Sequence, residues 1–196
     1  ILESLSLADS LKYAEGRVDS WLGMSSLYSH KDSIKKYVEK ADLVSDAIGY
    51  QRGIAEVLRK YALLALKKKE YVTSLEKAKK AESIYKTINS ETNFLFIGRQ
   101  AATLNQISNI YNSMGDVGTS LDYNLKAMEV LSDNKDHSQY RWSKNMAIKN
   151  YAELERYRKS LSLSLELIDE SIMYGDSTNF SNGIYRASNA YRNLGI

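Results

Sequence analysis

Apolar side chains between residues 100 and 131 follow a helical spacing in two runs separated by a short break. In the first run, "QAATLNQISNIYNSM", apolar residues follow at steps of three, three, one and three positions, and the second run has a similar helical spacing. Such stripes predict two amphipathic helices, each with one buried face. The break is Gly115-Asp116, where glycine can adopt the left-handed conformation that ends a helix and aspartate can cap the next one. The stretch therefore predicts a helical hairpin. The stripe residues are Leu104, Ile107, Ile110, Tyr111 and Met114, followed by Leu121, Leu125, Met128 and Leu131.

The hairpin pattern recurs along the chain. Tyr111, Tyr151 and Tyr191 are separated by 40 residues each, and we expect all three to be equivalent and mostly buried. A Ser-Leu or Ser-Ile step also recurs, and we interpret its small serine as the place where two antiparallel helices approach. The sequence predicts one helical-repeat domain over residues 1–196, with units at approximately 15–48, 50–92, 94–135, 138–176 and 179–196. The last unit is truncated, and we expect the chain to be a fragment of a larger protein. The recurring steps are Ser33-Ile34, Ser74-Leu75, Ser120-Leu121 and Ser160-Leu161.

The best-defined unit resembles the tetratricopeptide repeat (TPR) family. The family pattern is matched by Ser108, Tyr111, Gly115-Asp116, Ser120-Leu121 and Ala127, and the resemblance covers most of residues 50–196. It implies an all-α fold, a right-handed superhelix of stacked helical hairpins. The spacing of about 40 residues exceeds the usual 34, and no proline follows the second helix. Longer repeats of this kind are similar to those of kinesin light chains and of bacterial signalling and transcription-regulatory proteins.

Composition excludes several functions. The net charge of +3 is too small for a dedicated nucleic-acid binder, and no apolar run approaches the roughly 18 residues of a membrane span. The run Lys67-Lys68-Lys69 could contact nucleic acid or anionic lipid. Because glutamates are interleaved around it, we favour an ordinary exposed helix. The absence of cysteine excludes disulfides and thiolate metal sites.

No pattern of catalytic residues is visible. The two histidines, His30 and His137, are more than a hundred residues apart, and neither belongs to a metal-ligand spacing. The chain also lacks a phosphate-binding loop and a nucleophile elbow. We therefore expect no enzyme activity, no catalytic residue, no metal and no cofactor.

The TPR resemblance implies candidate binding residues. In TPR arrays, five positions of the first helix line the concave groove, and seven of the 13 asparagines in this chain fall at such positions. We expect these amides to be exposed and unpaired with protein, because an amide side chain offers a donor and an acceptor that suit the backbone of an extended peptide. Two cations could pair with a carboxylate, and two aromatic rings could supply a stacking surface. The alternative is that an asparagine-rich composition scatters amides over the surface, with Trp142 in the core. The predicted peptide-binding residues are Asn105, Asn109, Asn112, Trp142, Asn145, Lys149, Asn182, Tyr185, Asn189 and Arg192.

These observations favour a non-enzymatic scaffold that binds a protein or peptide segment. We expect it to be the sensory or interaction region of a larger bacterial regulatory or signal-transduction protein. A cytoplasmic location is favoured over the periplasm. The alternative is a structural or oligomerisation module that forms a homodimer and leaves the groove empty.

Overall fold

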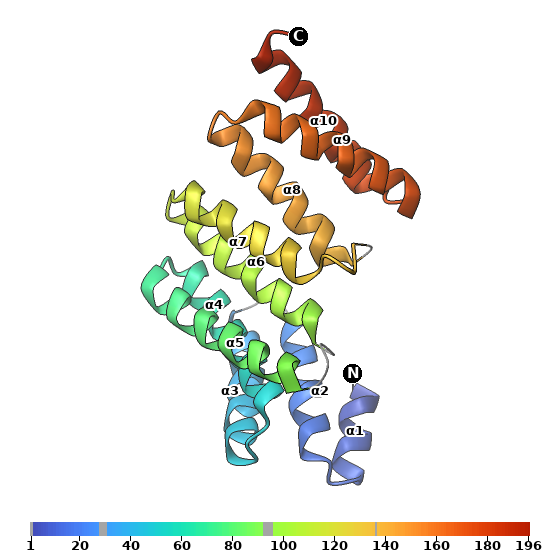
Figure 1. Ribbon diagram of the computed structural model, residues 1–196. Coiled ribbons are helices and arrows are strands. Elements are labelled where there is room, and N and C mark those ends of the chain that lie inside the picture. The colour runs from blue at the N-terminus through green and yellow to red at the C-terminus, as the bar shows by residue number, and fades with distance from the viewer. Residues whose placement is uncertain (1, 28–30, 92–95, 136) are drawn as a thin grey trace. The chain divides into compact units, whose positions relative to one another are not determined.

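The computed structural model describes residues 2–27, 31–91, 96–135 and 137–196, and every regular element in these ranges is a helix (Figure 1). The all-α prediction is therefore confirmed. The chain divides into two compact units, Ile1–Phe96 and Ile97–Ile196. The repeat boundaries and the single-domain extent stay predictions. His30, noted in the sequence, lies outside the described residues.

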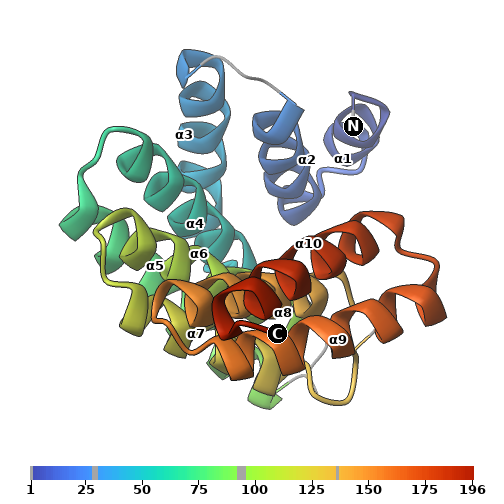
Figure 2. The same cartoon turned by 90° about the horizontal axis from the view of Figure 1, so that it is seen from above.

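Unit 1 holds five helices around an apolar core. α2 packs between α1 and α3, and α4 packs between α3 and α5. Figure 2 shows α1 and α3 on either side of α2. Val18 and Trp21 of α2 meet Val38 of α3 and Val57 of α4 in the core, and all four are buried. The helices are α1 (Leu2–Ser10), α2 (Ala14–Leu27), α3 (Lys31–Ala47), α4 (Gln51–Lys67) and α5 (Tyr71–Glu91).

Unit 2 holds the other five helices, and from α7 onward each packs on the one before it. We use helix A for the first helix of each hairpin, here α6, α8 and α10, and helix B for the second, here α7 and α9. α8 also contacts α6 and α10, so the three A helices are neighbours. The helices are α6 (Ile97–Ser113), α7 (Val117–Val130), α8 (Ser138–Glu153), α9 (Tyr157–Tyr174) and α10 (Ser177–Leu194).

The turn between α6 and α7 has the predicted structure. Gly115 has a φ of +85°, and the carboxylate of Asp116 accepts a hydrogen bond of 3.0 Å from the backbone N–H of Thr119, which caps α7. Behind this turn, the hydroxyl oxygens of Ser108 and Ser120 are 2.9 Å apart, and both residues are buried. The small side chains therefore let α6 and α7 approach closely, as predicted.

α4 and α8, each the first helix of a hairpin, end with the same geometry without glycine. Lys69 and Glu155 have φ values of 63° and 58°, in the left-handed region that non-glycine residues rarely adopt. Each takes the place of Gly115 in its unit, and Gly195 ends α10 in the same way, with a φ of 72°. The turn geometry thus repeats even where the glycine does not.

Candidate functional site

The predicted binding residues all belong to the three A helices of unit 2, but they differ in burial. The first group is enclosed in the protein and comprises Asn105 and Asn145, with exposed fractions of 4% and 8%. The second group is exposed or half-buried, and we call it the helix A face. It consists of Asn109 and Asn112 of α6, Trp142 and Lys149 of α8, and Asn182, Tyr185, Asn189 and Arg192 of α10.

Asn105 belongs to a buried network of polar side chains between α6, α7 and α8. Its Nδ2 lies 3.2 Å from the side-chain oxygen of Gln139 and 3.4 Å from the carbonyl oxygen of the same residue. Its Oδ1 accepts hydrogen bonds from Ser143 at 2.8 Å and from Asn124 at 3.4 Å. All four hydrogen-bonding positions of an amide are thereby used. The expectation that Asn105 is exposed and unpaired is wrong, because it faces the next A helix.

The same network continues through Asn124 and Asn150. The Nδ2 of Asn150 donates to the Oδ1 of Asn124 and to the hydroxyl of Ser120, both at 3.0 Å. Ser108 donates to the same Asn124 oxygen at 2.9 Å. The network therefore joins one hairpin to the first helix of the next, and its amides are structural.

Asn145 has the same position as Asn105 in the next repeat, and its side chain is also hydrogen-bonded within the protein. Its Oδ1 accepts a hydrogen bond of 2.6 Å from the Nε of Arg186 on α10. The expectation of a free amide is wrong here as well, for the same reason: Asn145, like Asn105, points at the next A helix. Tyr185 has this position in α10 and is 65% exposed, because α10 packs on α8 and α9 alone among the described helices of its unit.

Arg186 is a half-buried cation that the sequence analysis did not single out. Burial lowers the pKa of its guanidinium, and the charge of Glu153 acts in the opposite direction. No ion pair with a carboxylate is found for it within the described part of the chain, whereas Arg141 of α8 pairs with Asp176 at 2.8 Å. A signal was present in the sequence, because α10 carries two arginines and no acidic residue to neutralise them.

Lys149, one of the two cations predicted as anchors, is already paired. The Nζ of Lys149 lies 3.2 Å from a carboxylate oxygen of Glu153, one helical turn away. A surface pair of this type is weak, at about 0–1 kcal/mol, so it does not prevent Lys149 from meeting another carboxylate. Arg192 is exposed near the end of α10.

Trp142 and the three recurring tyrosines differ in how far neighbouring helices bury their side chains. Trp142 is 38% exposed, so the alternative that it is a core residue is wrong. Tyr111 is half-buried and stacks on Tyr123 of α7, with ring centroids 5.5 Å apart. Tyr151 is buried between side chains of α7 and α9. Tyr191 lies on an A helix as predicted, but it is 40% exposed, which corrects the expectation of burial.

α8 also contains a buried lysine that the sequence analysis missed. The Lys144 side chain is 1% exposed, and its Nζ lies 2.8 Å from Glu170 and 3.2 Å from Glu166 of α9. Burial alone would lower the pKa of Lys144, but the hydrogen bond to Glu170 and the nearby charges raise it above its usual range. Its aligned residues are apolar, Leu104 and Ile184, and a lysine at such a position could have indicated a buried ion pair.

The remaining chemistry of the described residues is sparse. No group of three or more histidine, aspartate or glutamate side chains that could hold a metal ion is found in the described ranges. The Nδ1 of His137 accepts a hydrogen bond of 3.1 Å from the backbone N–H of Gln139, so this histidine caps α8. Within the same ranges, no helix is both long and apolar enough to cross a membrane.

Comparisons with known proteins identify the fold class. No family model matches the sequence, and no curated protein matches it. Solved structures with TPR-like repeats do match. BtubC from P. vanneervenii matches with a TM-score of 0.72 and 14% identity, over 98% of this chain and 81% of that chain. The nearly identical TPR-like repeats of a candidate kinesin light chain from Podosopora anserina match with a TM-score of 0.67 and 12% identity, over 91% and 87%.

A third match is a signal transduction ATPase with numerous domains (STAND) and a tetratricopeptide repeat sensor from Pyrococcus horikoshii. Its TM-score is 0.71 at 15% identity, over 91% of this chain but only 27% of that protein. At these identities the likeness shows the fold, which is a TPR-like solenoid. The predicted resemblance to TPR proteins is therefore confirmed.

Proposed function

We propose that this chain is a non-enzymatic protein-interaction scaffold, and that its helix A face holds an extended segment of a partner protein. The A helices of a TPR-like solenoid run side by side, so their exposed side chains can meet a segment that crosses several helices. On this face the amides of Asn109, Asn112, Asn182 and Asn189 are accessible, although asparagine is a poor residue within a helix. Such amides suit the alternating N–H and C=O groups of an extended backbone.

The proposal rests on the environment of Arg186, a half-buried guanidinium for which no carboxylate partner is found among the described residues. A guanidinium that loses water without gaining an anionic partner destabilises the folded protein, and a bound carboxylate would remove that cost. Its Nε donates to Asn145, and no hydrogen bond of its other two nitrogens is found among the described residues, so both remain for a bidentate contact. We therefore expect the bound segment to carry an aspartate or glutamate side chain, with Trp142 and Tyr185 as apolar surfaces beside it.

A test can use random peptides displayed on phage, selected against the whole chain. Fluorescence anisotropy would then measure the dissociation constant of a selected peptide. The double variant Asn109→Ala/Asn189→Ala should bind at least tenfold more weakly, a difference of about 1.4 kcal/mol, and should melt at an unchanged temperature. Arg186→Gln should weaken acidic peptides more than neutral ones.

Asn134→Ala is the matched control, because Asn134 is an exposed asparagine in the turn after α7. It should bind like the unchanged chain. Selected peptides that bind all of these variants equally would contradict the proposal. A selection without acidic residues would contradict the part played by Arg186.

The setting of this scaffold is a second part of the proposal. We place it as the sensor or interaction region of a larger bacterial regulatory protein in the cytoplasm. The sensor part of this proposal is supported by the likeness to the STAND protein with a repeat sensor, in which the matched region is a small part of the chain. The coding sequence on either side of these residues tests this point directly. An adjoining ATPase, kinase or DNA-binding domain would support it, and a flanking hydrolase domain would contradict it.

A further inference from the structure

The lysines of the α4–α5 hairpin form a charged surface that the proposed function does not use. Residues 67–86 contain seven lysines, three glutamates and no arginine, whereas the whole chain has a net charge of only +3. The positive charge of the protein is therefore concentrated on this hairpin. The lysines are Lys67, Lys68, Lys69, Lys77, Lys79, Lys80 and Lys86.

Most of these lysines gather on the turn before α5 and on one side of that helix. Val72, Lys79 and Lys86 are seven residues apart, so they lie one above another along the same side of α5. All three are exposed, Val72 to 80%. Lys68 and Lys69 are exposed in the turn that precedes them. We call this surface the lysine face. Its exposed members are Lys68, Lys69, Val72, Glu76, Lys79, Lys80, Ser83, Lys86 and Thr87.

The neighbouring glutamates neutralise only part of this charge. Glu76 pairs with Lys80 at 2.8 Å, and Glu70 approaches Lys68 at 3.9 Å. Both pairs are exposed to solvent and therefore weak. No ion pair is found for Lys86 within the described ranges. The interleaved glutamates, which favoured an ordinary exposed helix, thus leave a surface that is positive.

The same side of another second helix is built differently. Lys79 lies five residues after Ser74, the recurring serine of α5, and Leu125 lies five residues after Ser120, the recurring serine of α7. Leu125 is half-buried and packs on a core cluster that includes Tyr151. Because lysine is almost never buried without a partner, this side of α5 is a charged surface and not a helix-packing one.

The chemistry of the lysine face fits an anionic membrane better than nucleic acid. Lysine ammonium groups are point charges, without the planar fork by which arginine grips a single phosphate or a base edge. From Lys69 to Lys86 they extend over roughly 25 Å, which suits a continuous charged surface. An exposed valine among them adds nothing to a phosphate contact, but Val72 can enter the headgroup region of a bilayer.

We propose that the lysine face binds the surface of an anionic membrane. The ammonium groups lie against lipid phosphates and carboxylates, and Val72 enters the headgroup region. The attraction acts over about one Debye length, roughly 8 Å at physiological salt, so added salt weakens it. Contact of this kind holds the scaffold at a membrane without a spanning helix.

Cosedimentation of the whole chain with lipid vesicles tests the proposal. Vesicles that contain phosphatidylserine should bind the chain, and vesicles of phosphatidylcholine alone should not. The triple variant Lys69→Gln/Lys79→Gln/Lys86→Gln should bind the anionic vesicles about 100-fold more weakly, because each lysine near an anionic surface contributes about a factor of five.

The matched control is Arg156→Gln/Arg158→Gln/Lys159→Gln, which removes the same charge from three exposed cations around the start of α9. It should bind like the unchanged chain. Equal losses for the two triple variants would show that net charge alone attracts the protein, and would overturn the proposal.

Lys69→Gly keeps the test decisive if circular dichroism shows that the first triple variant is unfolded. Lys69 has a left-handed φ of 63°, at the place where α6 is followed by Gly115. Since glycine adopts this conformation without strain, the variant should melt at the same or a higher temperature and still bind about fivefold more weakly. Unchanged binding would contradict the proposal.

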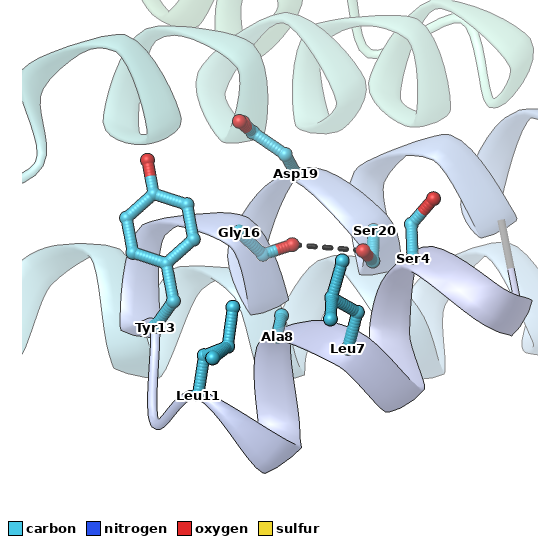
Figure 3. Close-up of a pocket in the computed structure, with 8 residues that line it drawn as sticks. All are labelled: Ser4, Leu7, Ala8, Leu11, Tyr13, Gly16, Asp19 and Ser20. Carbon is cyan, nitrogen blue, oxygen red and sulfur yellow. Dashed lines mark hydrogen bonds between the residues drawn. The ribbon is translucent and has the colours of Figure 1, made fainter.

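Exposed apolar side chains could attach the chain to a bilayer without the lysines. Leu7 and Leu11 of α1 are 60% and 67% exposed and line an apolar hollow of about 390 Å³ between α1 and α2 (Figure 3). α1 contains no lysine or arginine, so it does not attract an anionic surface. Leu7→Ser/Leu11→Ser should therefore leave vesicle binding unchanged. A loss of binding in this variant, equal binding to neutral vesicles, or binding of duplex DNA without binding of anionic vesicles would each overturn the proposal.

Discussion

α6 and α10 are two A helices of the same repeat, and they differ in what covers them. Leu104, Ser108 and Asn105 of α6 are 4%, 2% and 4% exposed. The aligned residues Ile184, Ser188 and Tyr185 of α10 are all exposed. α6 is covered by α7 and α8, whereas α10 contacts α8 and α9 within its unit. Position within the repeat fixes the direction of a side chain, and the neighbouring helices fix whether it becomes core or surface.

The largest effect on stability is expected at Lys144 of α8, which aligns with Leu104 of α6. Lys144→Ala removes the partner of Glu170 and leaves a carboxylate in a poorly hydrated site. Breaking a buried pair in this way costs about 3–5 kcal/mol of unfolding free energy, measured by urea unfolding. Lys35 pairs with Glu39 on an exposed surface, so Lys35→Ala should cost no more than about 1 kcal/mol. Similar costs for the two variants would show that the Lys144 pair is not buried in solution.

The small serines give the next effect. Ser120→Leu places a large side chain against Ser108, where α6 and α7 are closest, and overpacking of this kind costs about 1–3 kcal/mol. Ser188→Leu, at the uncovered equivalent of Ser108, should change the unfolding free energy by less than about 0.5 kcal/mol. Thermal unfolding of the two variants measures the contrast. A neutral Ser120→Leu would mean that the hairpin register is wrong.

A smaller effect concerns acid stability at the start of α10. The backbone and side-chain N–H groups of Asn179 hold the pKa of Asp176 below its usual range, and Arg141 adds to this. Since the folded pKa is lower than the unfolded value of about 3.9, the stabilisation is full above that pH and is lost as pH falls through the folded pKa.

Asp176→Asn keeps an acceptor for the cap but removes the charge, so unfolding free energy should fall less between neutral pH and about pH 3. At neutral pH the change should cost about 0.3–1 kcal/mol, because it removes a negative charge from the N-terminus of α10. Asp133→Asn, in the turn after α7, is the control and should leave the acid-induced loss unchanged. An identical pH dependence for Asp176→Asn and the unchanged chain would contradict the assignment.

The parts of the fold that the sequence predicted are those encoded by adjacent residues. Gly115 and Asp116 specify the turn by their own conformations, and Ser108 and Ser120 meet across it because the turn is short. Their structure needs no knowledge of distant helices. The helical class follows in the same way from the spacing of apolar residues.

The parts that the sequence did not predict depend on the next hairpin. Asn105 and Asn145 belong to the same predicted set as the exposed amides. They are buried because Gln139 of α8 and Arg186 of α10 form hydrogen bonds with them. Tyr191 differs from Tyr151 for the opposite reason, because helices on both sides enclose only Tyr151. A pattern along one helix cannot show how far its neighbour extends over it.

The most direct measurement compares Leu104→Ala with Ile184→Ala by urea unfolding. The two residues have the same position in the repeat, but Leu104 is buried and Ile184 is exposed. Leu104→Ala should cost about 2–5 kcal/mol of unfolding free energy, because it leaves a cavity between α6 and α7. Ile184→Ala should change it by less than about 0.5 kcal/mol at concentrations where the chain is monomeric. Equal costs for the two variants would contradict the account, because cover by neighbouring helices would then not decide what this repeat position does.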